Sequence, residues 1–390
     1  MAGDHRPGPH FLQIPGPTNV PERVLRAIAA PTIDHRGPEF ARLAREVAVG
    51  LGEVFGTSRP VVVYPSSGTG AWEAALVNTL SPGDRVLMFE TGHFATLWSA
   101  MARRLELDVD FVPGDWRRGA DPAIVEAKLV EDRAHTIKAV AVVHNETSTG
   151  VASRIAEIRG AIDAARHPAL LLVDTISSLG AIEYHHDVWR VDVTVGCSQK
   201  GLMLPPGLGF NAVSEAAMRA SEKARLPRAY WLWDDVLRQH ASGFYPYTPA
   251  TNLLFGLRES LAMLREEGLP AVFARHARHA GATRRAVAAW GLETQCTDAR
   301  EHSGSLTAVR VPDGHDADRV RAIALDDFNL SLGSGLGKLQ GAVFRIGHLG
   351  HFNDLMLIGT LGGVEMALAR AGVPVRAGGV QAAVDLLGTR

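Results

Sequence analysis

The chain has 390 residues, and its 40 Lys and Arg nearly balance its 42 Asp and Glu to leave a net charge of -2. Since a single hydrophobic core stops growing near about 250 to 300 residues, this length predicts a large domain with a smaller companion. No long run of either charge occurs, so we expect neither a nucleic-acid partner nor a membrane surface, and a small-molecule substrate fits better.

The first residues predict an extended arm. Residues 14–21 carry prolines at positions 15, 17 and 21, and proline fits neither a helix interior nor a central strand. We therefore expect residues 1–20 to form an N-terminal arm.

Short apolar runs alternate with longer helical patterns from residue 60 to residue 215. This alternation is typical of an α/β fold with a mostly parallel sheet that helices cover on both faces. Seven strands are expected, at residues 61–64, 85–89, 109–112, 137–143, 170–173, 193–196 and 209–213. Helices are expected between them, at residues 70–80, 93–105, 122–130 and 155–165.

The pattern changes after residue 250. Leucines at positions 253, 254, 257, 261 and 264 have helical spacing, and Gly268 ends that helix. We expect the helix to lead from a large domain at residues 21–255 into a small α+β domain at residues 256–390. The small domain is expected to hold a helix near residues 271–290, strands near 306–311 and 342–346, and a closing helix near 353–371.

Targeting and redox signals are weak in this sequence. Residues 1–10 lack the apolar core of a secretory signal, and no uncharged apolar stretch reaches the ~18 residues of a membrane span. The two cysteines, Cys197 and Cys296, are too few for a disulfide framework and lack CxxC spacing. These features predict a cytoplasmic protein without membrane spans.

Two strand ends carry the most informative residues. Asp174 closes the apolar run Leu-Leu-Val-Asp, and Lys200 closes the sequence Ser-Gln-Lys 26 residues later. Pyridoxal phosphate needs a carboxylate beside its ring nitrogen and a lysine that can bind its aldehyde. Ligands of open α/β sheets collect outside the carboxyl ends of the strands, where both residues fall. Asp or Lys at a strand end is nevertheless common, so other residues must decide.

A turn rich in small residues follows the first strand. Residues 65–70, Pro-Ser-Ser-Gly-Thr-Gly, precede a helix, so backbone N–H groups and the helix dipole favour an anion there. Such turns are often plain helix N-caps. Together with Asp174 and Lys200, however, the turn completes a set that consists of a phosphate site, a partner for a pyridinium nitrogen and a trap for an aldehyde.

Three further features have two interpretations each. Phe94 follows another strand end, where its ring could stack on a pyridine ring or belong to the core equally well. The polar run at residues 144–150 suits hydrogen bonds to ring substituents, although polar strand-end loops are frequent. Arg345 lies in an apolar strand, where a guanidinium needs an anion, and both a substrate carboxylate and an internal Asp or Glu could supply it.

Three groups of histidines resemble metal ligands by their spacing, at residues 185–187, 275–279 and 348–351. No cysteine or compact carboxylate set completes any of them. We therefore expect no metal and interpret these histidines as solvated or structural.

With these residues assembled, the chain resembles the fold-type I, class V aminotransferases, and more narrowly the serine:glyoxylate and alanine:glyoxylate aminotransferases. The likeness extends from residue 11 to residue 350. Its most specific motifs are Ser-Gly-Thr-Gly-Ala-Trp-Glu at residues 67–73, His-Asn-Glu-Thr at 144–147, Gly-Cys-Ser-Gln-Lys at 196–200 and Leu-Pro-Pro-Gly-Leu at 204–208. The resemblance implies pyridoxal 5'-phosphate as the cofactor, and amino acids and 2-oxo acids as substrates.

The resemblance also implies a role for each cofactor residue. Lys200 would bind the cofactor covalently and then move the α-proton, while Asp174 would pair with the ring nitrogen. Phe94 would stack on the ring, and Thr147 would contact its hydroxyl. The phosphate would be held by Ser67, Gly68, Thr69 and Gln199.

The substrate side of the implied site uses two subunits. Arg345 would bind the α-carboxylate, and Pro15 and Gly16 of the arm would assist it. The family forms homodimers in which each subunit completes its neighbour's site. The residues implied to act in the neighbouring site are Tyr245 and Thr248 at the phosphate, and His35 and Arg36 at the substrate side chain.

The implied reaction is a ping-pong transfer of the amino group of L-serine, and also of L-alanine, to glyoxylate, giving hydroxypyruvate and glycine. An L-aspartate:glyoxylate aminotransferase shares almost every motif, and an acidic side chain could pair with Arg36. A cysteine desulfurase is disfavoured because residues 331–337 carry no cysteine. A non-catalytic binding protein of this family ranks lower, because Lys200 and Asp174 are both present.

Overall fold

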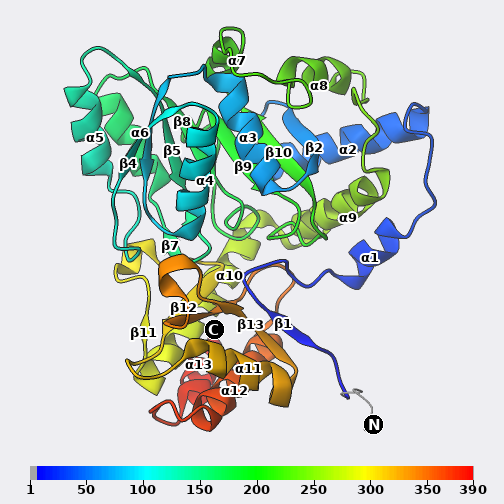
Figure 1. Cartoon of the computed structure of the whole chain (residues 1–390). Coiled ribbons are helices and arrows are strands. Elements are labelled where there is room, and N and C mark those ends of the chain that lie inside the picture. The colour runs from blue at the N-terminus through cyan, green and yellow to red at the C-terminus, as the bar shows by residue number, and fades with distance from the viewer. Residues whose placement is uncertain (1–6, 390) are drawn as a thin grey trace.

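Two larger β-sheets organise the computed structural model, which describes residues 7–389 (Figure 1). The expected α/β fold, with a seven-stranded mostly parallel sheet and a smaller C-terminal sheet domain, is confirmed. The first six residues of the predicted arm and Arg390 lie outside the described residues. The strand order of the larger sheet is β2 (Val61–Ser66), β10 (Gly207–Val213), β9 (Val193–Cys197), β8 (Leu170–Asp174), β5 (Ile137–Val143), β3 (Arg85–Phe89) and β4 (Asp108–Val112).

The strands from β9 to β4 run parallel, and β10 is antiparallel to both of its neighbours. All seven strands lie within a few residues of the expected ranges, because each is a short apolar run bounded by turn residues. Since the parallel strands end at one edge, the residues that follow them meet there.

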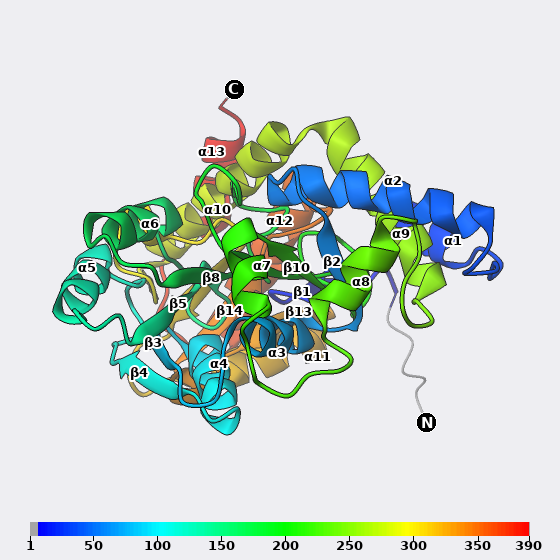
Figure 2. The same cartoon turned by 90° about the horizontal axis from the view of Figure 1, so that it is seen from above.

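Helices cover both faces of the larger sheet. In Figure 2, α3 (Gly68–Thr79) and α4 (His93–Arg104) lie on one face, while α2 (Pro38–Phe55) and α6 (Ile155–Ala164) lie on the other. The remaining helices of this part are α1 (Glu22–Ile28), α5 (Pro122–Glu131), α7 (Glu215–Ser221), α8 (Trp233–His240) and α9 (Thr251–Glu267). A short two-stranded sheet, β6 (Asn145–Glu146) and β7 (Val151–Ala152), follows β5.

The smaller sheet lies below the larger one in Figure 1. Its strand order is β1 (Phe11–Gln13), β13 (Leu330–Ser334), β14 (Val343–Gly347), β12 (Leu306–Arg310) and β11 (Glu293–Thr294). Its helices are α10 (Leu269–Trp290), α11 (Ala317–Phe328), α12 (Asp354–Arg370) and α13 (Gly379–Leu387), with single turns η1 (Ala299–Glu301) and η2 (Gly337–Leu339). The sequence predicted α10, β12, β14 and α12 but not α11, β13 or α13.

Two hydrophobic cores match the two sheets. The first core continues through α9 to Val272 in α10, and the second begins at Ala282 in the same helix. Because α10 contributes to both cores, this single helix connects them. The domain boundary predicted at residue 255 stays a prediction.

The arm joins the two sheets. β1 pairs in parallel with β13 of the smaller sheet, and residues 14–21 then form neither helix nor strand, as expected from their prolines. Thr18 attaches the arm to the loop that holds Lys200. Its backbone N–H donates to the Gln199 carbonyl at 3.1 Å, and its hydroxyl donates to the Lys200 carbonyl at 3.1 Å. Within residues 7–389, no helix combines the length and the apolarity that crossing a membrane requires.

Candidate active site

Asp174 and Lys200 lie at the same edge of the larger sheet. Asp174 is the last residue of β8, and Lys200 follows the end of β9 by three residues. Since β8 and β9 pair in parallel, both residues leave the sheet at the carboxyl ends of neighbouring strands. The structure therefore brings these two predicted residues together.

Asp174 is a buried carboxylate that neutral donors surround. It is 3% exposed, and it accepts hydrogen bonds from Trp72 Nε1 at 3.0 Å and from the Ile176 N–H at 2.6 Å. Burial raises the pKa of the Asp174 carboxyl to about 7. A carboxylate in such surroundings would be stabilised by a cationic ring N–H, so Asp174 fits the nitrogen of a pyridinium ring. The sequence did not indicate the Trp72 contact.

Lys200 is buried beside the arm. It is 8% exposed, and Nζ donates to the Pro15 carbonyl at 2.5 Å. Burial lowers the pKa of the Lys200 amine to about 8. A larger fraction of this amine is neutral near neutral pH than for an exposed lysine, which suits attack on an aldehyde.

The N-terminus of α3 presents uncapped amides next to Asp174. No side chain caps this helix, and the first amide that bonds back into it is that of Ala71. The amides of the first turn at Gly68 and Thr69 are therefore free to bind a phosphate. A Cβ on Gly68 would lie 2.3 Å from Ile176 Cδ1, so a larger residue here would force the Ile176 side chain to move.

The other predicted phosphate residues flank this turn. Ser67 precedes the helix, and Thr69 is exposed. The side-chain oxygen of Gln199 is buried and has no hydrogen-bond partner within residues 7–389. A buried polar atom without a partner is costly, so Gln199 is suited to a ligand that the chain itself does not provide.

The polar run at residues 144–150 positions α4 and Phe94. Glu146 accepts from the N–H groups of Phe94 at 3.3 Å and Ala95 at 3.0 Å, and Ser148 Oγ accepts from the His93 N–H at 2.9 Å. The run thus caps a helix, a role that the sequence did not indicate. The Thr147 hydroxyl donates to Ser177 Oγ at 2.8 Å. A cofactor that contacts Thr147 would therefore share this hydroxyl with Ser177.

Arg345 is a buried cation in β14 that donates to backbone carbonyls. It is 7% exposed, and it donates from Nε to the Ser334 carbonyl at 2.7 Å and from Nη1 to the Thr147 carbonyl at 2.8 Å. No Asp or Glu among residues 7–389 forms an ion pair with it, so the internal acidic partner is not observed. Burial lowers the pKa of the guanidinium to about 10, and an anionic ligand would relieve this cost.

Four predicted residues are not brought to this cluster within one chain. His35 and Arg36 lie in the loop between α1 and α2, at the outer edge of the molecule (Figure 1). Tyr245 packs against Phe40 with ring centroids 5.9 Å apart, and Thr248 is exposed. Their roles stay predictions that require a second subunit.

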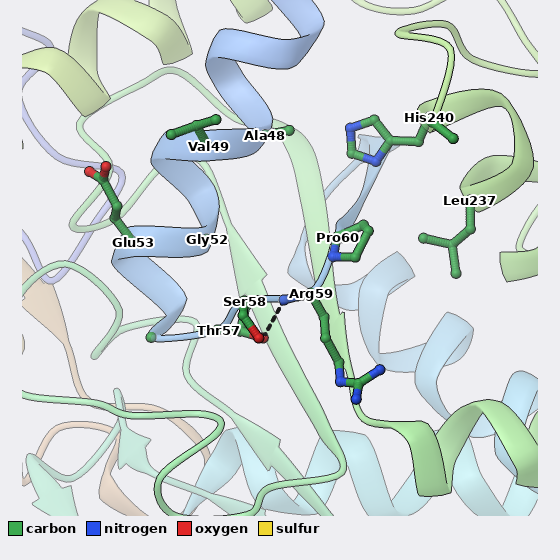
Figure 3. A pocket seen from close by; sticks show the side chains of 12 residues that line it. Ala48, Val49, Gly52, Glu53, Thr57, Ser58, Arg59, Pro60, Leu237 and His240 are labelled. Atoms are coloured by element: carbon green, nitrogen blue, oxygen red, sulfur yellow. Dashed lines mark hydrogen bonds between the residues drawn. The ribbon is translucent and has the colours of Figure 1, made fainter.

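One pocket of the surface lies apart from this site. Figure 3 shows this pocket of about 470 Å³ between α2 and α8, whose lining includes Val49, Arg59 and His240. It contains none of the predicted site residues. The candidate active site is therefore identified by the residues at the sheet edge and not by this pocket.

Two of the histidines with metal-like spacing contact other groups of the protein. No group of three or more His, Cys, Asp or Glu in the part of the chain that the structure describes could hold a metal ion. His276 instead accepts from the Gly350 N–H at 3.1 Å, and His348 contacts the Thr307 hydroxyl at 3.0 Å.

Known proteins resemble this chain over nearly its whole length. The family model for class-V aminotransferases matches residues 10–342. A serine–glyoxylate aminotransferase of Methylorubrum extorquens is 48% identical over 99% of this chain and 98% of its own. An L-aspartate–glyoxylate aminotransferase of Paracoccus denitrificans is 46% identical over 95% of this chain and 94% of its own. The crystal structure of pyridoxamine-pyruvate aminotransferase from Mesorhizobium loti has a TM-score of 0.92 at 29% identity, covering 99% of this chain and 98% of that one. The chain belongs to the class-V aminotransferase family.

Proposed function

We propose that this class-V aminotransferase binds pyridoxal 5'-phosphate at the edge of the larger sheet and transfers the amino group of L-serine to glyoxylate. The convergence of Asp174 and Lys200 beside the uncapped N-terminus of α3 carries the cofactor assignment. The serine–glyoxylate relative at 48% identity supports the choice of substrates.

The cofactor, when bound, supplies an aldehyde that takes up the amino group and a ring that accepts the electron pair from Cα. The free amides at the start of α3 would hold its phosphate, and Asp174 would accept a hydrogen bond from its ring nitrogen. The cation at that nitrogen would favour the ionised form of Asp174, against the effect of burial. Phe94, fixed by the Glu146 cap of α4, would contact the face of the ring.

Lys200 and Arg345 would act on the substrate. Arg345 presents a buried guanidinium to a carboxylate, which orients Cα relative to Lys200. The Lys200 amine, with a pKa of about 8, can hold or release a proton near neutral pH and so serve as the general base at Cα. In the same half-reaction this amine would return the proton on the cofactor side, and with glyoxylate as the substrate it would move the proton the opposite way, to Cα.

We also infer a homodimer with shared sites. The Tyr245 hydroxyl is buried without a partner within residues 7–389, and so is His35 Nε2, which leaves both atoms for groups from outside the chain. A mixture of a Lys200→Ala variant with a Tyr245→Phe/Thr248→Ala variant should regain activity, because a mixed dimer has one intact site. A protein that stays monomeric at micromolar concentration would contradict this inference.

L-aspartate is the second candidate donor. The aspartate–glyoxylate relative is 46% identical, and Arg36 is exposed on the loop before α2, where it could meet an acidic side chain. Neither similarity value separates the two donors.

The experiment that tests the function mixes the purified protein with L-serine, L-aspartate or L-alanine in the absence of a keto acid. The visible spectrum of the cofactor and the released keto acid are followed. Fast spectral conversion with serine and release of hydroxypyruvate support the proposal. Faster conversion with aspartate would replace serine as the donor, and a coloured protein that none of the three converts would reject all three donors.

A further inference from the structure

Three side chains join the larger domain to the smaller one. Glu90 follows β3 and Trp116 follows β4, whereas Lys338 belongs to η2 of the smaller domain. Lys338 Nζ donates to Glu90 Oε1 and lies 5.3 Å from the centre of the Trp116 ring. Trp116 Nε1 donates to the same Glu90 oxygen at 3.0 Å. Each of the three side chains thus contacts the other two.

Trp116 is inserted from the larger domain into the smaller one. Its side chain is 3% exposed and packs with Leu339 and Val343, and its carbonyl accepts from Gln295 Nε2 at 2.9 Å. Trp116 has a φ of +65°, a region of backbone conformation that is unfavourable for a bulky residue. Surrounding contacts must hold a residue in this conformation, and here the smaller domain provides them.

A short segment, residues 334–339, connects this cluster to the candidate active site. At one end, the Ser334 carbonyl accepts from Arg345 Nε at 2.7 Å. At the other end, a Cβ on Gly337 would lie 3.0 Å from the Trp116 ring and 3.3 Å from His93 Nδ1. His93 is the first residue of α4 and precedes Phe94. The segment therefore spans the distance from the Arg345 guanidinium to the start of α4.

We propose that Glu90, Trp116 and Lys338 form a clamp between the domains that positions Arg345 for the substrate carboxylate. The clamp holds residues 334–339 against the larger domain, and the Ser334 carbonyl transmits that position to Arg345. The proposal rests on the proposed function, because that function assigns the carboxylate to Arg345. All three are positioning residues, since they act through Ser334 and not on the reacting atoms.

Lys338→Met tests the clamp because it removes the charge and keeps the length of the side chain. Lys338 is 62% exposed and Glu90 15%, so we expect a modest effect. KM should rise about threefold to tenfold for the amino acid and for glyoxylate together, with little change in kcat and none in the cofactor spectrum. Both substrates should respond because each has a carboxylate. Glu90→Gln should act alike, and the double variant should be no worse than either single one.

The chain contains a matched control for this variant. Arg370 pairs with Asp327 and lies 4.8 Å over the Phe328 ring, with 58% of its side chain exposed. These contacts join α11 and α12 inside the smaller domain. Arg370→Met therefore removes the same kinds of contact without touching the clamp, and its KM values should equal those of the unmodified enzyme.

A second readout does not depend on turnover. In the protein without cofactor, amide hydrogen exchange of residues 334–339 should be faster in Lys338→Met than in Arg370→Met. Unchanged KM values in both clamp variants, an equal rise in Arg370→Met, or additive effects in the double variant would overturn the proposal. If no donor is transaminated, the proposed function fails, and the exchange comparison alone decides: faster exchange supports the clamp and unchanged exchange rejects it.

Discussion

Lys200 Nζ donates a hydrogen bond to the backbone carbonyl of Pro15, which joins the lysine side chain to the N-terminal arm. The arm reaches this position from β1, which is paired with the smaller sheet. It then returns to the lysine loop, where the Thr18 hydroxyl donates to the Lys200 carbonyl. One segment therefore contacts the smaller sheet, the Lys200 side chain and the Lys200 backbone, so its conformation bears on the reactivity of the lysine.

Gly16→Ala should displace the arm from Lys200. Gly16 has a φ of +96°, and a Cβ there would lie 2.4 Å from Lys200 Cδ. We expect a loss of about 1 to 3 kcal/mol in unfolding free energy from the backbone conformation alone, and slower cofactor uptake. Gly8→Ala is the control, because Gly8 has a similar φ of +85° with nothing within 4 Å. Equal cofactor uptake in the two variants would show that the arm does not constrain the lysine.

Lys200→Ala should lower the rate of transamination by at least about a hundredfold, because the general base and the covalent attachment are both lost. Noncovalent cofactor binding through the α3 N-terminus should persist. Single-turnover absorbance and mass spectrometry after borohydride reduction measure the two effects. Lys138→Ala serves as control, since its Nζ donates to the His135 carbonyl on the surface. Substantial turnover by Lys200→Ala would remove the lysine from the role of base.

The pH dependence of cofactor uptake should report the pKa of Lys200. Only the neutral amine attacks an aldehyde, and burial lowers this pKa to about 8 from the ordinary value of 10.5. The rate at which cofactor-free protein develops colour with pyridoxal phosphate should rise with pH and level off above about 8. A rate that continues to rise beyond pH 9.5 would indicate an unperturbed lysine.

Asp174→Asn should change the pH dependence of stability in the cofactor-free protein. The carboxyl has a pKa of about 7 when folded, against an ordinary value of 3.8. Between these values the folded state binds one more proton than the unfolded chain, so the free energy of unfolding falls as pH rises from 4 to 7. An asparagine side chain binds no proton in this range. As pH rises from 4 to 7, the free energy of unfolding of the variant should therefore gain up to about 4 kcal/mol relative to that of the unmodified protein. Urea unfolding at several pH values measures this difference, and Asp313→Asn, at an exposed position, is the control. If the free energies of unfolding of Asp174→Asn and the unmodified protein depend on pH in the same way, the prediction is refuted.

Arg345→Lys should weaken both substrates. Lysine keeps the charge but loses the planar fork that binds a carboxylate with two hydrogen bonds, so KM for the amino acid and glyoxylate should rise about tenfold to a hundredfold. Arg321→Lys is a suitable control, because Arg321 also donates from Nε to a carbonyl of β13 but pairs with Asp318. Unchanged KM values in Arg345→Lys would make Arg345 a purely structural residue.

Much of the fold follows from local patterns. Each strand of the larger sheet is a short apolar run between turn residues, and the helices that follow them have their own periodicity, so both could be predicted without contacts. The smaller domain was harder, because α11 also carries apolar residues on its exposed side and β13 is short and rich in glycine and serine. The position of β13 is decided by pairing with β14, which follows it in the chain, and with β1, which is distant in sequence.

The sequence by itself determined the family, the class of fold and the chemistry of the strand ends, since residue type and position after a strand are local properties. Only the tertiary structure decided that Trp72 donates to Asp174, that Glu146 caps α4, and that Arg345 bonds to backbone carbonyls and not to an internal acid. These contacts join residues that are between 11 and 198 positions apart. Their formation depends on how helices and strands pack in three dimensions, which the spacing of residues along the chain does not specify.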